Sequence, residues 1–350
     1  MECHVHDAVA AGRLERLLQA AATVEEHTGT DLEGTLPLLE FAAEVDVNRF
    51  SLTNSVFTRV GLYMHPYASL INHSCDYNSV VAFDGEELYV KAIRPIKKGE
   101  QIFITYTDPT IPRWIRRQVL KKRYFFDCRC TKCLTEPDDL ETRFFSTPRS
   151  KETLLKTERE AIKSMRIAVA ADPADSVEKI QTVMRNLRES VQWPLTQQPY
   201  VSCRDELIIS SLQAGRNTLS FIHAAIRSLR INPKIYDKAH PLRQYHSYRL
   251  AEIMLQPSIH QLPSDPKDPV QIGDYNLPFQ YLAWKILHEL DGFQSTSCTM
   301  PSFKKLVADK YADLHGQLKG HGYDPVNVPS LVFEEWNKLE RLVDDVLSKE

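Results

Sequence analysis

Three cysteines crowd into six residues of this chain, Cys128, Cys130 and Cys133, in the spacing C-x-C-x-x-C. Thiols this close on a tight turn can face one metal ion, and a structural Zn²⁺ site needs four ligands in a tetrahedron. The fourth ligand must come from elsewhere, and Cys75 is the best candidate because it lies in another dense polar motif. The alternative is three unrelated thiols, but the scarcity of cysteine and this spacing favour a zinc site.

The composition is that of an intracellular globular protein. The first residues lack the basic-then-apolar pattern of a signal peptide, so we expect reduced thiols. No apolar run approaches the ~20 residues of a membrane span. The 350 residues suit two or three domains, and their net charge of −3 argues against broad phosphate neutralisation. We therefore expect a monomer of the nucleus and/or cytoplasm with no membrane partner and no direct nucleic-acid binding.

Apolar spacing predicts an α+β fold in which a β-rich core is followed by helices. Residues 8–45 have helical periodicity, whereas residues 52–106 contain short β-prone runs separated by turn residues. Asp84-Gly85 lies between two such runs and predicts a hairpin, since this dipeptide suits the tightest turns. The expected strands cover 79–83, 88–93 and 101–106, and a basic amphipathic helix is expected over 113–123, after Pro112.

The remainder of the chain predicts stacked helical hairpins without a repeat of fixed period. Residues 151–254 are helical in pattern, with breaks expected near Pro173, Pro194 and Pro233. A proline-rich stretch over 257–269 predicts a loop. Further helices are expected near 279–290, 301–317 and 330–348.

A second motif, Asn72-His-Ser-Cys-Asp-Tyr-Asn78, follows an apolar run. Because buried polar groups need hydrogen-bond partners, it is either a turn network or a ligand site, and the residues alone favour the turn. The motif is followed by the hairpin, by G-E-x-I-x-I-x-Y ending at Tyr106, and by C-x-C-x-x-C. In this order the motifs resemble the C-terminal half of a SET domain. The resemblance runs from Asn48 to Cys133 and is closest to the SMYD group of protein lysine methyltransferases. The helical region containing Ala239-His-Pro-Leu-Arg243 is more weakly similar to that group's tetratricopeptide-like domain.

This resemblance implies a division of the chain into four parts. They are a helical segment similar to a SET insert (1–47), a SET core (48–110), a post-SET zinc-binding segment (111–134) and an α-helical C-terminal domain (151–350). It also implies a cofactor site for S-adenosylmethionine formed by Asn48, Asn72, His73 and Phe126. Tyr106 would be the catalytic tyrosine, or else a core tyrosine with a satisfied hydroxyl group. Cys75, Cys128, Cys130 and Cys133 would hold the zinc ion.

The sequence departs from the family where SET domains begin. Strands with a G-x-G segment and a MYND zinc finger are not found, and the G-x-G of the chain, Gly320-His-Gly322, lies in the helical region. Tyr77 stands where the family usually has proline. The chain is then either a fragment of an active enzyme or a degenerate SET protein. We predict a SAM-dependent protein lysine N-methyltransferase acting on histone or other protein lysines. The alternative is a catalytically inactive, zinc-binding protein-interaction module.

A basic run precedes the cysteines. It contains Arg113, Arg116, Arg117, Lys121, Lys122 and Arg123. Such a run is usually a solvated helix face, and it could equally be a nuclear import signal.

Overall fold

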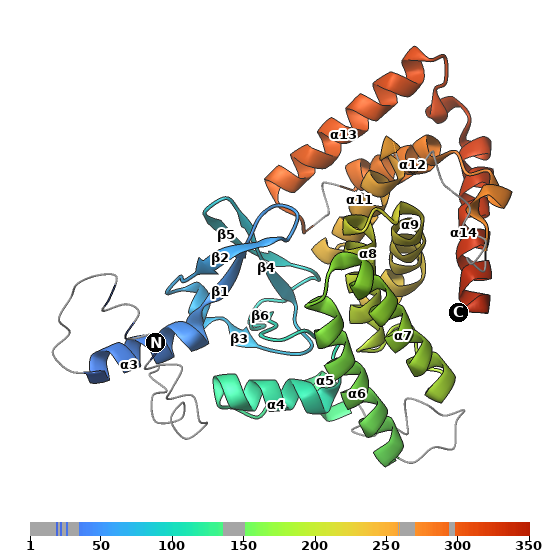
Figure 1. Cartoon of the computed structure of the whole chain (residues 1–350). Helices are drawn as coiled ribbons and strands as arrows, with labels where there is room; N and C mark the ends of the chain where they lie inside the picture. The colour runs from blue at the N-terminus through green and yellow to red at the C-terminus, as the bar shows by residue number, and fades with distance from the viewer. Residues whose placement is uncertain are drawn as a thin grey trace. The chain divides into compact units, whose positions relative to one another are not determined.

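The computed structural model describes residues 35–135, 151–257, 270–293 and 298–350, together with Gln19, Ala22, Glu26 and Ile259. The chain divides into two compact units, Met1–Asp138 and Asp139–Glu350. Every described strand lies in the first unit, and the regular elements described in the second are helical (Figure 1). This confirms the predicted α+β fold class with a helical C-terminal region. Most of the helical pattern predicted before residue 35 lies outside the described residues.

The described part of the first unit contains three two-stranded sheets. Their strands are β1 (Phe50–Thr53), β2 (Arg59–Tyr63), β3 (Asn72–His73), β4 (Ser79–Asp84), β5 (Glu87–Ala92) and β6 (Phe103–Ile104). β1 pairs antiparallel with β2, β4 pairs antiparallel with β5, and β3 pairs parallel with β6. Parallel strands need a long crossover connection. Here that connection contains the whole β4–β5 hairpin.

The β4–β5 hairpin confirms the turn predicted at Asp84-Gly85. Asp84 pairs with Glu87, and Gly85 has a φ of +61°, a conformation that glycine adopts without a steric penalty. The third predicted strand is shorter than expected, since only Phe103 and Ile104 pair. The backbone groups on either side of this pair bond side chains instead of a neighbouring strand, as described for the site below.

The helices described in the first unit are α3 (Thr35–Asn48), α4 (Arg113–Tyr124) and α5 (Thr131–Thr135), with a 3₁₀ turn at Ala68–Leu70. Helix α4 confirms the basic helix predicted over 113–123, and it ends at Phe125, whose φ is +61°. One part of that prediction is wrong, because Arg116 does not lie on a solvated face. It is 1% exposed, and its Nη1 donates to the carbonyl oxygen of Ile111 at 2.6 Å.

The second unit consists of helices that pack against their neighbours in sequence. They are α6 (Lys151–Val169), α7 (Pro173–Val191), α8 (Tyr200–Gln213), α9 (Asn217–Ile226), α10 (Asn232–Ile235), α11 (Pro241–Met254), α12 (Phe279–Gly292), α13 (Pro301–Gly320) and α14 (Pro329–Lys349), with 3₁₀ turns at Ile272–Tyr275 and Pro325–Asn327. One buried hydrophobic cluster contains Trp193, from the loop between α7 and α8, together with residues of α6, α7 and α8. A larger hydrophobic cluster includes Phe221, Trp284 and Leu339. The tetratricopeptide-like resemblance of this region stays a prediction.

The breaks predicted near Pro173, Pro194 and Pro233 all occur, the last of them between the end of α10 at Ile235 and the start of α11 at Pro241. The chain continues from α9 through a π-helical turn, Arg227–Ile231, into α10, where Pro233 lies in the first turn. The π-helical turn just before Pro233 already interrupts the regular i→i−4 bonding, which accommodates a residue that lacks an N–H. Most of the proline-rich loop predicted over 257–269 lies outside the described residues.

One buried ion pair joins two distant helices of the second unit. Arg204 on α8 is fully buried, and its Nη2 donates to both carboxylate oxygens of Glu350 at 2.8 and 2.6 Å. Its Nη1 lies 2.6 Å from Nδ1 of His223, whose pKa burial lowers well below the usual value. The imidazole is therefore neutral and accepts from the guanidinium group. Among the described helices, none has the length and apolar character required to cross a bilayer.

Candidate functional site

The parallel pairing of β3 with β6 brings the Asn72–Asn78 motif to the strand that ends at Tyr106. Asn72 pairs with Phe103 and His73 with Ile104. Beyond the pair, the backbone N–H of Ser74 donates to the carbonyl oxygen of Ile104 at 3.0 Å. The residues that follow each strand therefore lie side by side, although about thirty positions separate them in sequence.

Asn78 joins the motif to the β6 segment by side-chain hydrogen bonds. Its Oδ1 accepts from the Phe103 N–H at 2.8 Å, and its Nδ2 donates to the Gln101 carbonyl oxygen at 2.9 Å. The side chain is 0% exposed. Because a buried amide must find partners, this residue accounts for the polar character at the end of the motif. The turn network favoured on sequence grounds is therefore present.

His73 and Tyr106 are connected directly. The Tyr106 N–H donates to Nδ1 of His73 at 2.9 Å, and the Tyr106 hydroxyl donates to the Ile71 carbonyl oxygen at 2.5 Å. Burial, aided by the charge of Arg116, lowers the pKa of His73 to about 4, so the ring is neutral at pH 7. Since Nδ1 accepts, the proton lies on Nε2, which is 3.2 Å from the Cys75 sulfur. This histidine thus links the tyrosine to the cysteine cluster.

Four aromatic rings gather around this connection. The Tyr106 ring centroid lies 5.2 Å from that of His73 and 4.7 Å from that of Tyr124, while Phe126 lies 5.8 Å from His73. Burial, with a smaller contribution from Tyr124, raises the pKa of Tyr106 to about 12. Its phenol therefore stays protonated at neutral pH, and it can donate a hydrogen bond but cannot act as a general base.

The two asparagines predicted to contact a cofactor differ in their settings. Asn72 is exposed on β3. Asn48 is the last residue of α3, and its amide donates to the Glu44 carbonyl oxygen of the same helix at 2.9 Å. The Asn48 carbonyl oxygen accepts from Ser69 Oγ at 3.2 Å. The end of α3 therefore contacts the chain at Ser69, three residues before Asn72. The structure thus brings Asn72, His73, Tyr106 and Phe126 together and places Asn48 beside the segment that leads to them.

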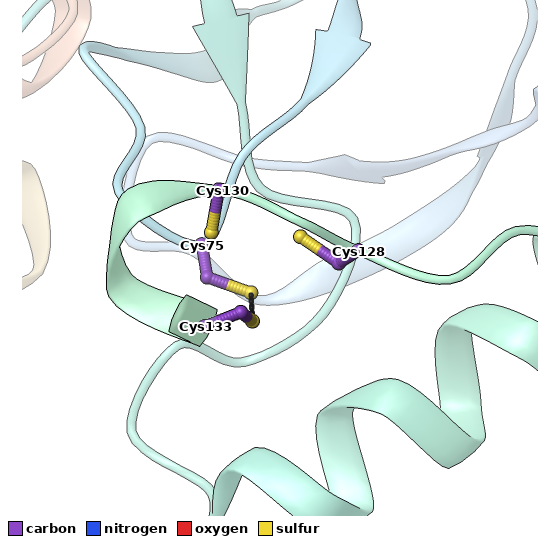
Figure 2. A group of neighbouring side chains, drawn as sticks. All are labelled: Cys75, Cys128, Cys130 and Cys133. Carbon is purple, nitrogen blue, oxygen red and sulfur yellow. Dashed lines mark hydrogen bonds between the residues drawn. The ribbon is translucent and has the colours of Figure 1, made fainter. Parts of the chain in front are cut away.

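The four cysteines predicted as metal ligands form one cluster. All four sulfur atoms lie within 4.8 Å of one another, and those of Cys75 and Cys133 are 3.5 Å apart. Figure 2 shows the side chains converging from the loop after β3, from the segment after α4 and from the start of α5. Sulfurs at ~2.3 Å from a zinc ion stand roughly 3.8 Å apart in a tetrahedron, so this set of donors fits such an ion.

The charge state of the thiols is also suited to a metal. Burial raises the pKa of Cys75, and it raises that of Cys128 to about 11. Burial also acts on Cys130, but hydrogen bonds to its sulfur, beginning with that from the Cys133 backbone, outweigh it and lower the pKa to about 6. Without a metal the cluster therefore keeps protons that zinc would displace.

Two residues of the site were not identified from the sequence. Asn78 was quoted in the motif without a role, and the signal for it was the need of a buried amide for partners. Arg116 was counted with its charged neighbours. The signal that it differs is its helical spacing, since it is four positions before Leu120, which is fully buried against the cysteines.

Comparison with known proteins agrees with this geometry. Residues 14–107 match the SET domain family. This segment is similar to the SET domains of SMYD proteins. Mouse histone-lysine N-methyltransferase SMYD3 is 35% identical over 117 residues, which are 33% of this chain and 27% of that protein. Human N-lysine methyltransferase SMYD2 is 33% identical over 120 residues, 33% of this chain and 28% of that protein. SET domain and MYND-type zinc finger protein 6 of Schizosaccharomyces pombe is 36% identical over 113 residues, 31% of this chain and 23% of that protein.

The SET-domain match begins before the segment in which we recognised the resemblance, and it includes most of the segment predicted as a SET insert. The matches span 23–28% of the length of these relatives. The division of residues 1–134 into insert, core and post-SET segment stays a prediction.

Proposed function

We propose that this chain is a SAM-dependent protein lysine N-methyltransferase whose substrate is a lysine side chain of a histone or another protein. The observation that carries the proposal is the β3–β6 pairing, which places Tyr106 against His73 and lets its hydroxyl bond the carbonyl oxygen of Ile71, the residue before Asn72. The printed names of the SMYD2 and SMYD3 relatives support the same chemistry for the SET segment. In this proposal the cofactor contacts are made by Asn48, Asn72, His73 and Phe126.

S-adenosylmethionine supplies a sulfonium methyl group for in-line displacement by an amine. The protein's contribution is positioning, and holding the reacting atoms ~3–3.5 Å apart lowers the barrier by several kcal/mol. A lysine amine with a pKa of ~10.4 in water must lose a proton first, and the rings of Tyr106 and Tyr124 form an apolar surrounding that favours the neutral amine. The Tyr106 phenol, protonated at pH 7, orients that amine by a hydrogen bond.

We also propose that Cys75, Cys128, Cys130 and Cys133 hold a structural zinc ion. The convergence of the sulfur atoms supports it. The cluster borders the proposed reaction site, since the Cys75 sulfur is 3.2 Å from Nε2 of His73. Zinc would therefore fix the histidine that accepts from Tyr106.

The experiment that tests the proposal is calorimetric titration of S-adenosylmethionine into the zinc-loaded chain. We expect micromolar binding that is about five- to tenfold weaker in Asn72→Ala, since one good hydrogen bond contributes about 1–1.5 kcal/mol. The matched control is Asn337→Ala on α14, which should bind as the unmodified chain does. Absence of binding by a folded, zinc-loaded chain would contradict the proposal.

The second candidate is a zinc-binding protein-interaction module without activity. The observation that favours it is the outer surface of β2, where Val60 is 60% and Leu62 is 47% exposed. The described residues do not cover this apolar face, and exposed apolar surface of this kind is typical of a site that contacts a partner. This candidate predicts one bound zinc ion per chain and no heat on addition of S-adenosylmethionine.

A further inference from the structure

Positive charge is concentrated around the proposed reaction site. Residues 111–135 contain eight lysines and arginines and one acidic residue, Asp127, whereas the whole chain has a net charge of −3. Two of these cations form a basic patch, which we define as Arg117 and Lys121. The side chain of Lys121 is 69% exposed and that of Arg117 is 41% exposed.

The patch already holds one carboxylate. Asp127 lies 3.3 Å from Lys121 Nζ and 3.8 Å from Arg117 Nη2, and the carboxylate is itself 44% exposed. Ion pairs this exposed are weak, so they exchange readily with other carboxylates. The two contacts show that the spacing of the cations suits a carboxylate, and one acidic group leaves the patch with excess positive charge.

The patch lies next to the residues proposed to receive the substrate lysine. Tyr124, which packs against Tyr106, is seven positions after Arg117 and three after Lys121 on α4. Residues seven apart on a helix share one face and are roughly 10 Å apart along its axis. About three residues of an extended peptide span that distance.

We propose that the basic patch binds acidic side chains of the protein substrate, at positions about two to four residues from the lysine that is methylated. This inference rests on the proposed function, because only a methyltransferase would have such a substrate lysine. Because the patch is positively charged, we expect it to bind an acidic segment. A patch on one twelve-residue helix suits a short peptide better than the repeated phosphate contacts of a nucleic acid.

The test measures binding by fluorescence anisotropy, using a labelled peptide with one lysine flanked by aspartates and glutamates. The comparison peptide has asparagine and glutamine in their place. Lys121→Glu and Arg117→Glu should each weaken binding of the acidic peptide about three- to tenfold and leave the neutral peptide unchanged. Lys98→Glu changes the net charge equally at an exposed turn of the same unit and should have no effect.

Asp127→Asn supplies a variant of opposite sign. Removal of the competing carboxylate should strengthen binding of the acidic peptide about two- to fivefold. A variant that merely disturbs the fold would weaken binding, so opposite effects of Lys121→Glu and Asp127→Asn cannot arise from misfolding. Zinc content, measured for each variant, confirms that the neighbouring cysteines are intact.

Several outcomes overturn the inference. One is equal affinity for the acidic and neutral peptides, and another is no weakening by Lys121→Glu and Arg117→Glu. A third is tight binding of an RNA or duplex DNA oligonucleotide that the acidic peptide cannot displace. Titration of S-adenosylmethionine and methyl transfer to the neutral peptide are measured separately. If methyl transfer shows no preference for acidic residues near the lysine, the inferred role of the basic patch is wrong but the proposed function is not. If the chain does not bind S-adenosylmethionine, the proposed function is wrong, and the anisotropy measurement still tests whether the patch binds acidic peptides.

Discussion

Burial raises the pKa of the Cys75 thiol, and the positive charge of Arg116, an arginine that is almost fully buried, opposes that rise. A zinc ion held by four thiolates keeps a net negative charge, and a buried charge is costly unless an opposite charge accompanies it. Arg116 supplies that charge from within α4. The pair thus joins the helix to the cysteine cluster electrostatically as well as by packing.

Arg116→Met is accordingly expected to weaken zinc binding about 10- to 100-fold, the usual effect of removing a partner of a metal ligand. Competition with a chromophoric chelator measures the affinity. Lys122→Met removes an exposed positive charge from the same helix and should leave it unchanged. Equal zinc affinity of Arg116→Met and the unmodified chain would contradict this role.

Cys128→Ser is expected to lose the zinc ion and to destabilise the first unit. Apparent binding energies of structural zinc reach ~10–16 kcal/mol in small fingers, so the loss should exceed that of an ordinary core substitution. Metal analysis and thermal unfolding provide the measurements. Cys203→Ser, at a buried cysteine of the second unit, should keep one zinc ion per chain. If Cys128→Ser also keeps it, the ligand assignment is wrong.

Asn78→Ala is expected to lower the free energy of unfolding of the first unit by about 2–4 kcal/mol. It removes the bonds to Phe103 and Gln101 and leaves their backbone groups without these partners, and each such loss costs ~1–3 kcal/mol. Urea denaturation measures the change. Asn54→Ala, where the side chain is exposed and accepts from Val56 and Thr58, should cost less than about 1 kcal/mol. Equal costs for the two variants would refute the argument.

Glu350→Gln is expected to destabilise the second unit by about 1–3 kcal/mol. It removes the charge that faces Arg204, and an unpaired buried charge is unfavourable, although the glutamate side chain is 19% exposed. Lys305→Met breaks an exposed bridge to Asp309 and should change stability by less than about 0.5 kcal/mol. Thermal unfolding of both variants under the same conditions decides the matter.

Tyr106→Phe is expected to reduce methyl transfer strongly while S-adenosylmethionine still binds. It should also alter stability at high pH. Because the pKa of Tyr106 is about 12 when folded and ~10 when exposed, its contribution to stability is complete below pH ~10 and is lost as the pH rises toward about 12. Denaturation at pH 8, 10 and 11 should show a shallower decline in the variant than in the unmodified chain.

The features predicted correctly from sequence have short-range signals. Asp84-Gly85 is enough to predict the β4–β5 hairpin, and the charged amphipathic run is enough to predict α4. The close spacing of three cysteines likewise predicts a cluster. In each case the interacting residues are neighbours in sequence, so composition and period determine the result.

The features that were missed depend on long-range contacts. The spacing of Arg116 from Leu120 is the one local sign that it differs from Arg117, and the packing of α4 against the cysteines leaves Arg116 buried and Arg117 half-exposed. The β3–β6 pair is two residues long in each strand, too short for periodicity to reveal.

The separation of Cys75 from Cys133, 58 positions along the chain, has a consequence for folding. A metal bound by both closes a loop that contains β4, β5, β6 and α4. Restricting an unfolded chain of that length by a crosslink removes conformational entropy equivalent to about 4 kcal/mol. Until Cys75 meets the later cysteines, zinc can be held by three nearby thiols only, so complete coordination reports that the two ends of this loop have come together.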